Sequence, residues 1–183
     1  MDGARFANAL VGLGCTPAEL TWKSGVDVMS FGATKNGAMM LEAVIFFDTS
    51  LAEDFLYRRM RSGQLLSKGR FLSAQMLSYL KDDVWLENAR IANGLAQELA
   101  TELGAFKNIR IPNPVQANEV FAIIPRHLND QLLAAGAKFY DWMPDSLGDG
   151  ISEDEIFVRF VLSFATPKED VTGFIALIRR LMN

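Results

Sequence analysis

The chain has 183 residues, of which 50% are hydrophobic, with 18 Lys and Arg against 22 Asp and Glu. This length fits one domain, or one domain with a small lobe, and half its residues can contribute to a sizeable core. A formal net charge of −4 without a continuous basic block argues against nucleic acid as the main partner. No apolar run has the length of a membrane span, and the start lacks a signal-peptide pattern. We therefore expect a cytoplasmic protein with no membrane partner.

The cysteine and histidine content limits the chemistry further. Cys15 is the single cysteine, which excludes an internal disulfide and fits a reducing compartment. An inert buried thiol is favoured over a nucleophile, because His127, the single histidine, is far away in the sequence. Since His and Cys form no cluster with metal-ligand spacing, we predict no metal site.

Residues 1–82 alternate helical and strand patterns, as is typical of an α/β domain. Gly14 suits the end of a first helix, and Thr16-Pro17-Ala18-Glu19 is a capping box that predicts the start of the next. Short apolar runs at residues 26–31 and 43–47 predict two strands joined by a functional turn.

Two further helices are predicted before residue 82. Ser50-Leu51-Ala52-Glu53 has the capping-box pattern and predicts a helix that runs to about Arg61. After an interruption at Ser62-Gly63, apolar residues recur at helical spacing over residues 69–80. Both segments are assigned to the same large domain.

Residues 83–183 are assigned to a smaller α/β lobe, an open sheet covered by helices. The longest amphipathic helix covers residues 83–103 and ends at Gly104. Strands are predicted at residues 109–111, 119–124, 138–143 and 157–164, helices at 126–135 and after a capping box at Thr166, and a polar loop at 144–155.

The turn between the first two strands carries a lysine among small residues. Lys35 is surrounded by Ser30, Gly32, Ala33 and Thr34, with Gly37 just beyond. Small side chains leave room for a bulky ligand close to the backbone, so Lys35 is our candidate for a Schiff base with pyridoxal phosphate. The alternative is a surface lysine on a glycine-rich turn, which is a common feature.

Four motifs occur in order along essentially the whole chain. They are Asp2-Gly3-Ala4-Arg5 with Phe6-Ala7-Asn8-Ala9, residues 27–42 around Lys35, residues 58–75 with Arg70-Phe71-Leu72-Ser73-Ala74-Gln75, and Val158-Arg159-Phe160-Val161. In these motifs the chain resembles the low-specificity L-threonine aldolase and phenylserine aldolase branch of the β-eliminating lyases, which are fold-type-I pyridoxal phosphate enzymes. In that family the Asp-Gly-Ala-Arg motif lies near the middle of the polypeptide. The resemblance therefore implies that this chain is the C-terminal half.

The resemblance also implies a domain assignment. Residues 1–82 would be the C-terminal part of the pyridoxal-phosphate-binding large domain, and residues 83–183 the small C-terminal α/β domain. The family's cofactor-stacking histidine and its phosphate cup would come from the other half. His127 is not assigned the stacking role, because it lies at a helix start in the small lobe.

Two roles toward the cofactor follow from the resemblance. Lys35 would hold pyridoxal phosphate and then exchange it for the substrate amine. Asp2 would bond the pyridine nitrogen and keep it protonated, so that the ring can accept electrons from the breaking bond. Judged from its position alone, Asp2 fits equally well as a helix cap near a terminus.

Three arginines are implied to bind anionic groups. Arg5 and Arg159 would clamp the substrate carboxylate, because the guanidinium fork matches a carboxylate in a way that lysine does not. Arg159 lies inside an apolar strand, where an unpaired charge is costly, and its alternative is an arginine that snorkels from an edge strand. Arg70 would contact the cofactor phosphate, within its own subunit or from the neighbouring one.

The implied reaction cleaves a β-hydroxy-α-amino acid of the threonine or phenylserine type to glycine and an aldehyde. The implied partners are this small-molecule substrate and further copies of the chain, in a homodimer or homotetramer. One alternative is a truncated, non-catalytic fragment of such an enzyme, with exposed strand edges and apolar surface. Another keeps the cofactor but changes the reaction, to that of a β-lyase or an aminotransferase relative.

Overall fold

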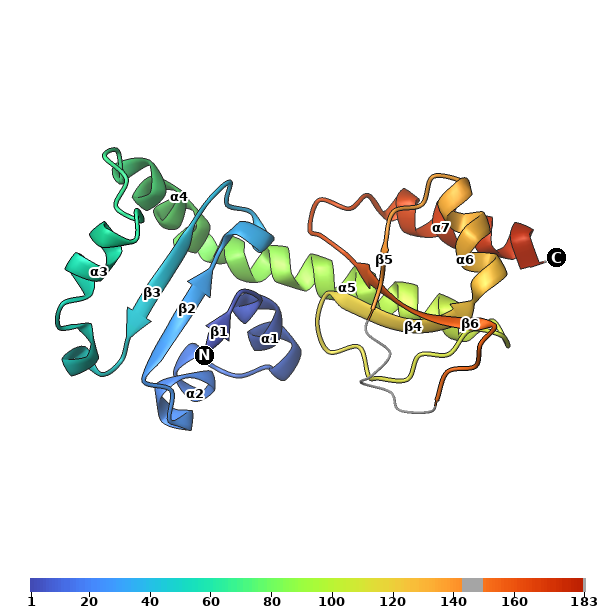
Figure 1. Cartoon of the computed structure of the whole chain (residues 1–183), viewed down its shortest axis with the longest axis horizontal. Helices are drawn as coiled ribbons and strands as arrows, with labels where there is room; N and C mark the ends of the chain where they lie inside the picture. Colours follow the sequence, from blue (N-terminus) through green and yellow to red (C-terminus); the bar gives the residue numbers. More distant parts are fainter. Residues whose placement is uncertain (143–149, 183) are drawn as a thin grey trace. The chain divides into compact units, whose positions relative to one another are not determined.

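The computed structural model describes residues 1–142 and 150–182. The chain divides into two compact units, residues 1–90 and 91–183 (Figure 1). Helix α5 (Val84–Gly104) contributes its first turns to the first unit and the remainder to the second. The domain boundary expected between residues 82 and 83 falls at the start of this helix and stays a prediction for the whole protein.

The first unit is built on a three-stranded sheet with the order β1-β2-β3. Its strands are β1 (Asp2–Gly3), β2 (Val28–Gly32) and β3 (Glu42–Phe46). β1 runs parallel to β2, whereas β3 runs antiparallel to it. The two strands predicted on either side of Lys35 are therefore confirmed.

Helices and short 3-10 turns complete the first unit. The helices are α1 (Phe6–Leu13), α2 (Pro17–Leu20), α3 (Phe55–Arg61) and α4 (Arg70–Leu80). The 3-10 turns are η1 (Trp22–Ser24), η2 (Thr34–Asn36), η3 (Thr49–Ala52) and η4 (Lys81–Asp83).

Two predicted helix signals of the first unit are confirmed. α1 ends at Gly14, whose φ of 63° is the left-handed conformation that glycine adopts without strain, and its N–H donates to the Leu10 carbonyl. Before α2, the Thr16 side chain accepts from the Glu19 N–H, while the Glu19 side chain accepts from the Thr16 N–H. Both devices satisfy backbone groups that a helix terminus leaves without partners.

The capping box predicted at Ser50 is wrong. The Asp48 carboxylate accepts hydrogen bonds from both the Ser50 N–H, at 3.0 Å, and the Ser50 hydroxyl, at 2.7 Å. Because Asp48 takes the capping role two residues earlier, the segment forms the 3-10 turn η3, and α3 starts only after Asp54. The shift illustrates how aspartate competes locally for backbone donors.

The core of the first unit lies on one face of its sheet. Met29 and Phe31 of β2 are buried there, against α1, α4 and the beginning of α5. The rings of Phe6, Phe31, Tyr79 and Trp85 form the centre, with centroids between 5.8 and 6.4 Å apart. Aromatic pairs at these separations add to the stabilisation that their burial provides.

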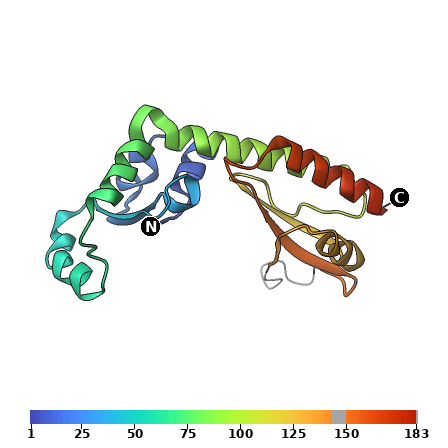
Figure 2. The same ribbon diagram turned by 90° about the horizontal axis from the view of Figure 1, so that it is seen from above.

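The second unit contains an antiparallel sheet with the order β4-β6-β5. Its strands are β4 (Glu119–Pro125), β5 (Tyr140–Asp141) and β6 (Glu155–Val161), so β6 is the middle strand. With α5, the helices of this unit are α6 (Arg126–Ala134) and α7 (Lys168–Met182). Figure 2 shows α7 beside α5, and ion pairs join Lys168 to Glu98 and Arg179 to Glu102.

Two predicted strands of this unit are shorter than expected. Instead of a strand at residues 109–111, Arg110 forms a single bridge with Ile123. The strand expected at residues 138–143 is reduced to β5, and residue 143 lies outside the described residues, as do residues 144–149 of the expected polar loop.

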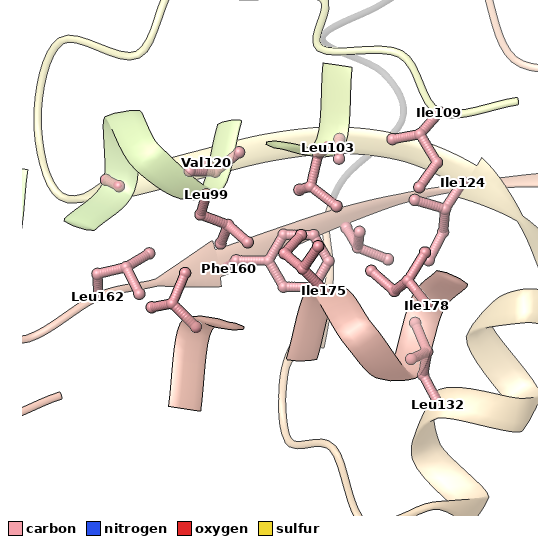
Figure 3. Packing of buried hydrophobic residues seen from close by; sticks show 14 of the residues in the cluster. Leu99, Leu103, Ile109, Val120, Ile124, Leu132, Phe160, Leu162, Ile175 and Ile178 are labelled. Atoms are coloured by element: carbon pink, nitrogen blue, oxygen red, sulfur yellow. The ribbon is translucent and has the colours of Figure 1, made fainter. Parts of the chain in front are cut away.

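The core of the second unit is formed by alternate residues of β4 and β6 together with α5, α6 and α7 (Figure 3). The even-numbered strand residues face it, among them Val120, Ile124, Val158 and Phe160. Each fully buried aliphatic side chain contributes about 1.5–3 kcal/mol. Since side chains alternate along a strand, the odd-numbered residues of β4 and β6 face the other side of the sheet.

Among the helices of the described residues, none is both long and apolar enough to cross a membrane.

Candidate functional site

The carboxyl ends of two parallel strands bring three predicted site residues to one part of the first unit. Asp2 lies in β1, Arg5 comes just after β1, and Lys35 comes just after the parallel strand β2. Parallel neighbours end at the same edge of a sheet, and open α/β sheets bind ligands outside the carboxyl ends of their strands. Asp2, Arg5 and Lys35 therefore define the candidate site.

Asp2 lies on the open face of the sheet, away from the aromatic core. It pairs with Ser30, which alternates along β2 with buried residues of the core and is itself paired with half-exposed Val44. Asp2 is exposed, and its Oδ1 accepts a hydrogen bond from the Ala4 N–H at 3.0 Å. The alternative assignment of Asp2 as a helix cap is wrong, because the residue before α1 is Arg5.

Two glycines allow β1 to approach β2 closely. A Cβ atom on Gly3 would overlap the backbone oxygen of Ser30. A Cβ atom on Gly32 would lie 2.9 Å from the Cα of Ala4 and 2.6 Å from Oε2 of Glu42. The pairing that places Asp2 beside β2 thus depends on the absence of side chains at both positions.

The turn η2, which carries Lys35, is closed by hydrogen bonds from Thr34 and Ala33 to Leu41. Lys35 is exposed. The Thr34 hydroxyl donates to the Leu41 carbonyl at 3.2 Å, and its oxygen accepts from the Leu41 N–H at 3.0 Å. The Ala33 N–H also donates to the Leu41 carbonyl, at 3.1 Å. These bonds hold residues 33–41 as a compact loop.

The residue after Lys35 fastens the same loop to the core. Asn36 is 3% exposed, and its Nδ2 donates to the Tyr79 hydroxyl at 2.6 Å and to the Trp85 carbonyl at 2.8 Å. The Asn88 Nδ2 donates to the Asn36 carbonyl at 2.9 Å. Lys35 is therefore exposed to solvent on a loop that is hydrogen-bonded, through Asn36, to the core of the first unit.

These anchoring residues are not evident from the sequence. Asn36 is 43 positions from Tyr79 and 49 positions from Trp85, so no local pattern links them. The one available signal was an asparagine directly beside the candidate lysine. Tyr79 has a pKa above its usual value because burial disfavours the phenolate; the Asn36 hydrogen bond opposes this shift, and the Glu42 charge adds to it.

A second contact joins the loop to α4. The Gln75 Oε1 accepts from the N–H groups of Met39 and Met40, at 3.0 and 3.2 Å. A hollow of about 350 Å³ lies between this part of the loop, α4 and the start of α5, with Gln75 and Asn88 in its lining. The lining does not include Lys35, so we do not assign this hollow to the lysine.

Arg70 is the first residue of α4 and is exposed. Its guanidinium carbon lies 5.9 Å from the ring centroid of Phe71, a separation at which cation–π attraction operates. It belongs to the same unit as Lys35, and its assignment to a phosphate group stays a prediction.

Arg159 belongs to the second unit. It lies in β6, the middle strand of its sheet, so the alternative of an arginine that snorkels from an edge strand is wrong. Its Nη1 is 3.3 Å from Oε1 of Glu119, and its guanidinium carbon is 4.1 Å from the ring centroid of Trp142. The Arg159 guanidinium therefore has two favourable neighbours in the sheet, the Glu119 carboxylate and the face of the Trp142 ring.

The remaining candidates have no part in the site. Cys15 is a free, half-buried thiol rather than the buried one expected. His127 is at the start of α6 in the second unit, as expected from sequence. No group of three or more His, Cys, Asp or Glu residues with metal-binding geometry occurs within residues 1–142 and 150–182.

The parallel strand pair, with a lysine and an aspartate at its carboxyl edge, defines an α/β protein with a candidate ligand site at the strand ends. The family model described as Beta-eliminating lyase matches residues 1–126. The chain belongs to the beta-eliminating lyase family.

Similar proteins agree with this family. The chain is 44% identical to a low specificity L-threonine aldolase of Pseudomonas sp. (strain NCIMB 10558), covering 100% of the chain and 50% of that protein. A threonine aldolase structure from Leishmania major matches with a TM-score of 0.85 and 27% identity, covering 100% of the chain and 51% of that structure. The chain thus spans about half the length of the curated relatives it matches.

A more distant structure supports the fold alone. Oryza sativa TDC, solved with PLP and tryptamine, matches over 100% of the chain and 42% of its own length, with a TM-score of 0.67 and 15% identity. The α/β class predicted from the sequence is confirmed, as is the placement of the chain as a partial match to a larger fold.

Proposed function

We propose that the protein to which this chain belongs is a pyridoxal-phosphate-dependent lyase that cleaves β-hydroxy-α-amino acids to glycine and an aldehyde. The observation that carries the proposal is the position of Lys35 just after β2, the strand whose parallel neighbour β1 carries Asp2. It occurs in a chain that is 44% identical, over its full length, to a low specificity L-threonine aldolase.

The residues of the first unit fit pyridoxal phosphate. Lys35 is exposed on an anchored loop, and it would bind the cofactor covalently through Nζ. Asp2 lies on the open sheet face, with Oδ1 engaged by the Ala4 N–H; its other oxygen would accept a hydrogen bond from the pyridine nitrogen. When bound, the cofactor supplies an electron sink for the bond that breaks.

The arginines would bind the anionic groups of cofactor and substrate. Arg5 follows the strand that carries Asp2, and Arg159 has a guanidinium oriented by neighbours in its own unit. We assign both to the substrate carboxylate, because two parallel N–H···O bonds fix its direction as well as its charge. Arg70 is assigned to the cofactor phosphate.

We further propose a cytoplasmic homodimer or homotetramer that acts on a small amino acid of the threonine or phenylserine type. One cysteine supports a reducing compartment. Exposed apolar side chains on α3 and α4, among them Leu56, Tyr57 and Leu77, support association between copies.

The test uses visible absorbance and product analysis. The purified chain with added pyridoxal phosphate is expected to develop a visible band that Lys35→Ala abolishes and that the control Lys23→Ala, at another exposed lysine, keeps. L-Threonine or phenylserine should then yield glycine and the aldehyde. A band without these products favours a β-lyase or aminotransferase relative. Equal spectra for Lys35→Ala and the unchanged chain would overturn the role of Lys35, and the absence of any band would identify a non-catalytic fragment.

A further inference from the structure

We propose that Glu119 is a positioning residue for Arg159, which it holds, together with the face of Trp142, in the orientation that receives the substrate carboxylate. The inference rests on the proposed function, in which Arg159 binds that carboxylate. It concerns residues of the second unit alone.

The strand register places these groups on one sheet face. Arg159 is paired with Phe121 on β4 and with Tyr140 on β5. Paired residues project to the same side, and Glu119, two positions from Phe121, projects to that side as well. The opposite side of the sheet packs against the hydrophobic core, so Arg159 and Glu119 lie on the face that does not contact the core helices.

The ion pair between them is partly shielded from water. Nη1 of Arg159 lies 3.3 Å from Oε1 of Glu119, and the two side chains are only 22% and 18% exposed. Such a pair is screened less by salt than one on the open surface. Removal of Glu119 would therefore leave a charged group in a sheet without the neighbour that directs it.

The aromatic neighbour, Trp142, also restricts the orientation of the Arg159 guanidinium. The Trp142 ring centroid is 4.1 Å from the Arg159 guanidinium carbon, well within the range of cation–π attraction. Trp142 is itself held, since its backbone N–H donates to the Phe157 carbonyl at 2.8 Å and its ring centroid lies 5.6 Å from that of Phe121. Trp142 sets the direction of the guanidinium plane, and Glu119 sets the rotation of the guanidinium within that plane.

One donor of the Arg159 guanidinium has no protein acceptor in the described residues. Oε1 of Glu119 forms an ion pair with Nη1 that lacks hydrogen-bond geometry, and the buried Nε–H has no hydrogen-bond acceptor in the described part of the chain. A buried donor without an acceptor is unfavourable, because it has lost its hydrogen bond to water without replacing it. A carboxylate bound at the edge formed by Nε and Nη2 would supply that acceptor in the bidentate geometry typical of arginine.

The kinetic experiment compares variants of the pyridoxal-phosphate-loaded full chain. Glu119→Ala is expected to raise KM for L-threonine about tenfold while kcat changes less than about twofold, because only carboxylate binding is weakened. Glu119→Gln keeps an acceptor oxygen and should recover part of the loss. The control Glu98→Gln breaks another ion pair of the same unit, with Lys168 at 3.2 Å, and should leave KM unchanged.

A second measurement does not depend on activity. The Nε–H signal of Arg159 in NMR spectra, identified by its loss in Arg159→Lys, is expected to exchange faster with solvent in Glu119→Ala and in Trp142→Leu. Glycine should shift this signal in the unchanged chain and less so in Glu119→Ala.

The outcomes separate the two proposals. If the unchanged chain shows no cleavage but the exchange rates and the glycine shift respond as expected, the chain by itself is a non-catalytic fragment and the positioning role stands. If Glu119→Ala lowers the thermal midpoint but alters neither KM, exchange nor the glycine shift, Glu119 is a structural partner only and the inference is overturned.

Discussion

The side chain of Asn36 donates a hydrogen bond of 2.6 Å to the hydroxyl of Tyr79, and this contact ties the turn of Lys35 to helix α4. Both residues are almost completely buried, at 3% and 4% exposure. The same amide also reaches the Trp85 carbonyl, so a single side chain connects the lysine turn to two helices. The position of Lys35 relative to β2 thus depends on a polar contact inside the core.

Asn36→Ala should destabilise the first unit. The substitution leaves the Tyr79 hydroxyl and the Trp85 carbonyl without this donor, and a buried polar group that loses its partner costs about 1–3 kcal/mol. Urea unfolding followed by circular dichroism measures the change. Asn113→Ala, at an exposed position, is the control and should change the free energy of unfolding by less than about 0.5 kcal/mol. Equal midpoints for both variants would contradict the anchoring role.

The stability of the chain should decline in alkaline solution in a way that depends on Tyr79. Burial raises the pKa of its hydroxyl in the folded state, so the folded state binds this proton more tightly than the unfolded state does. The associated stabilisation is complete below the unfolded pKa of about 10 and is lost as pH rises from there through the folded pKa.

Unfolding free energies measured below and above the pKa of tyrosine in the unfolded state test whether Tyr79 causes the alkaline decline. Tyr79→Phe should show a shallower alkaline decline than the unchanged chain. Tyr57→Phe, at an exposed tyrosine, should keep the full decline. A slope that is the same in all three proteins would show that Tyr79 is not the responsible group.

Gly3→Ala should disrupt the pairing of β1 with β2. The added Cβ would overlap the Ser30 backbone oxygen, which cannot move as the end of a flexible side chain could. We expect a loss of at least about 1–3 kcal/mol, together with weaker pyridoxal phosphate binding because Asp2 is displaced. Gly94→Ala is the matched control: nothing lies within 4 Å of its added Cβ in α5, and the change should stabilise by about 0.5–1 kcal/mol. Unfolding curves that rank the two variants in the opposite order would refute the close approach.

The isolated chain should self-associate. Leu56 and Leu77, on α3 and α4, are each 73% exposed, and Phe71 is 62% exposed. Exposed apolar patches favour association, so Leu56→Lys combined with Leu77→Lys should shift sedimentation toward the monomer. Leu133→Lys, at a less exposed leucine on α6, should have little effect. A clean monomer with cooperative melting in the unchanged chain would argue against this expectation.

Local signals predicted much of the secondary structure. The Thr16 capping box, Gly14 at the end of α1 and the periodicity of α5 each depend on residues within a few positions of one another, and all three are found. The prediction at Ser50 failed for an equally local reason, because Asp48 is the stronger competitor for the same backbone donors.

Residue patterns alone predicted the strands on either side of Lys35, the first helix ends and the set of candidate residues. These depend on local backbone preferences and on motifs shared with a family. The three-dimensional fold was needed to learn that Asp2 pairs with Ser30, that Asn36 is hydrogen-bonded to Tyr79, and that Arg159 lies in a middle strand against Glu119 and Trp142. Those contacts join residues far apart along the chain, so they arise from strand register and core packing, which local residue patterns do not specify.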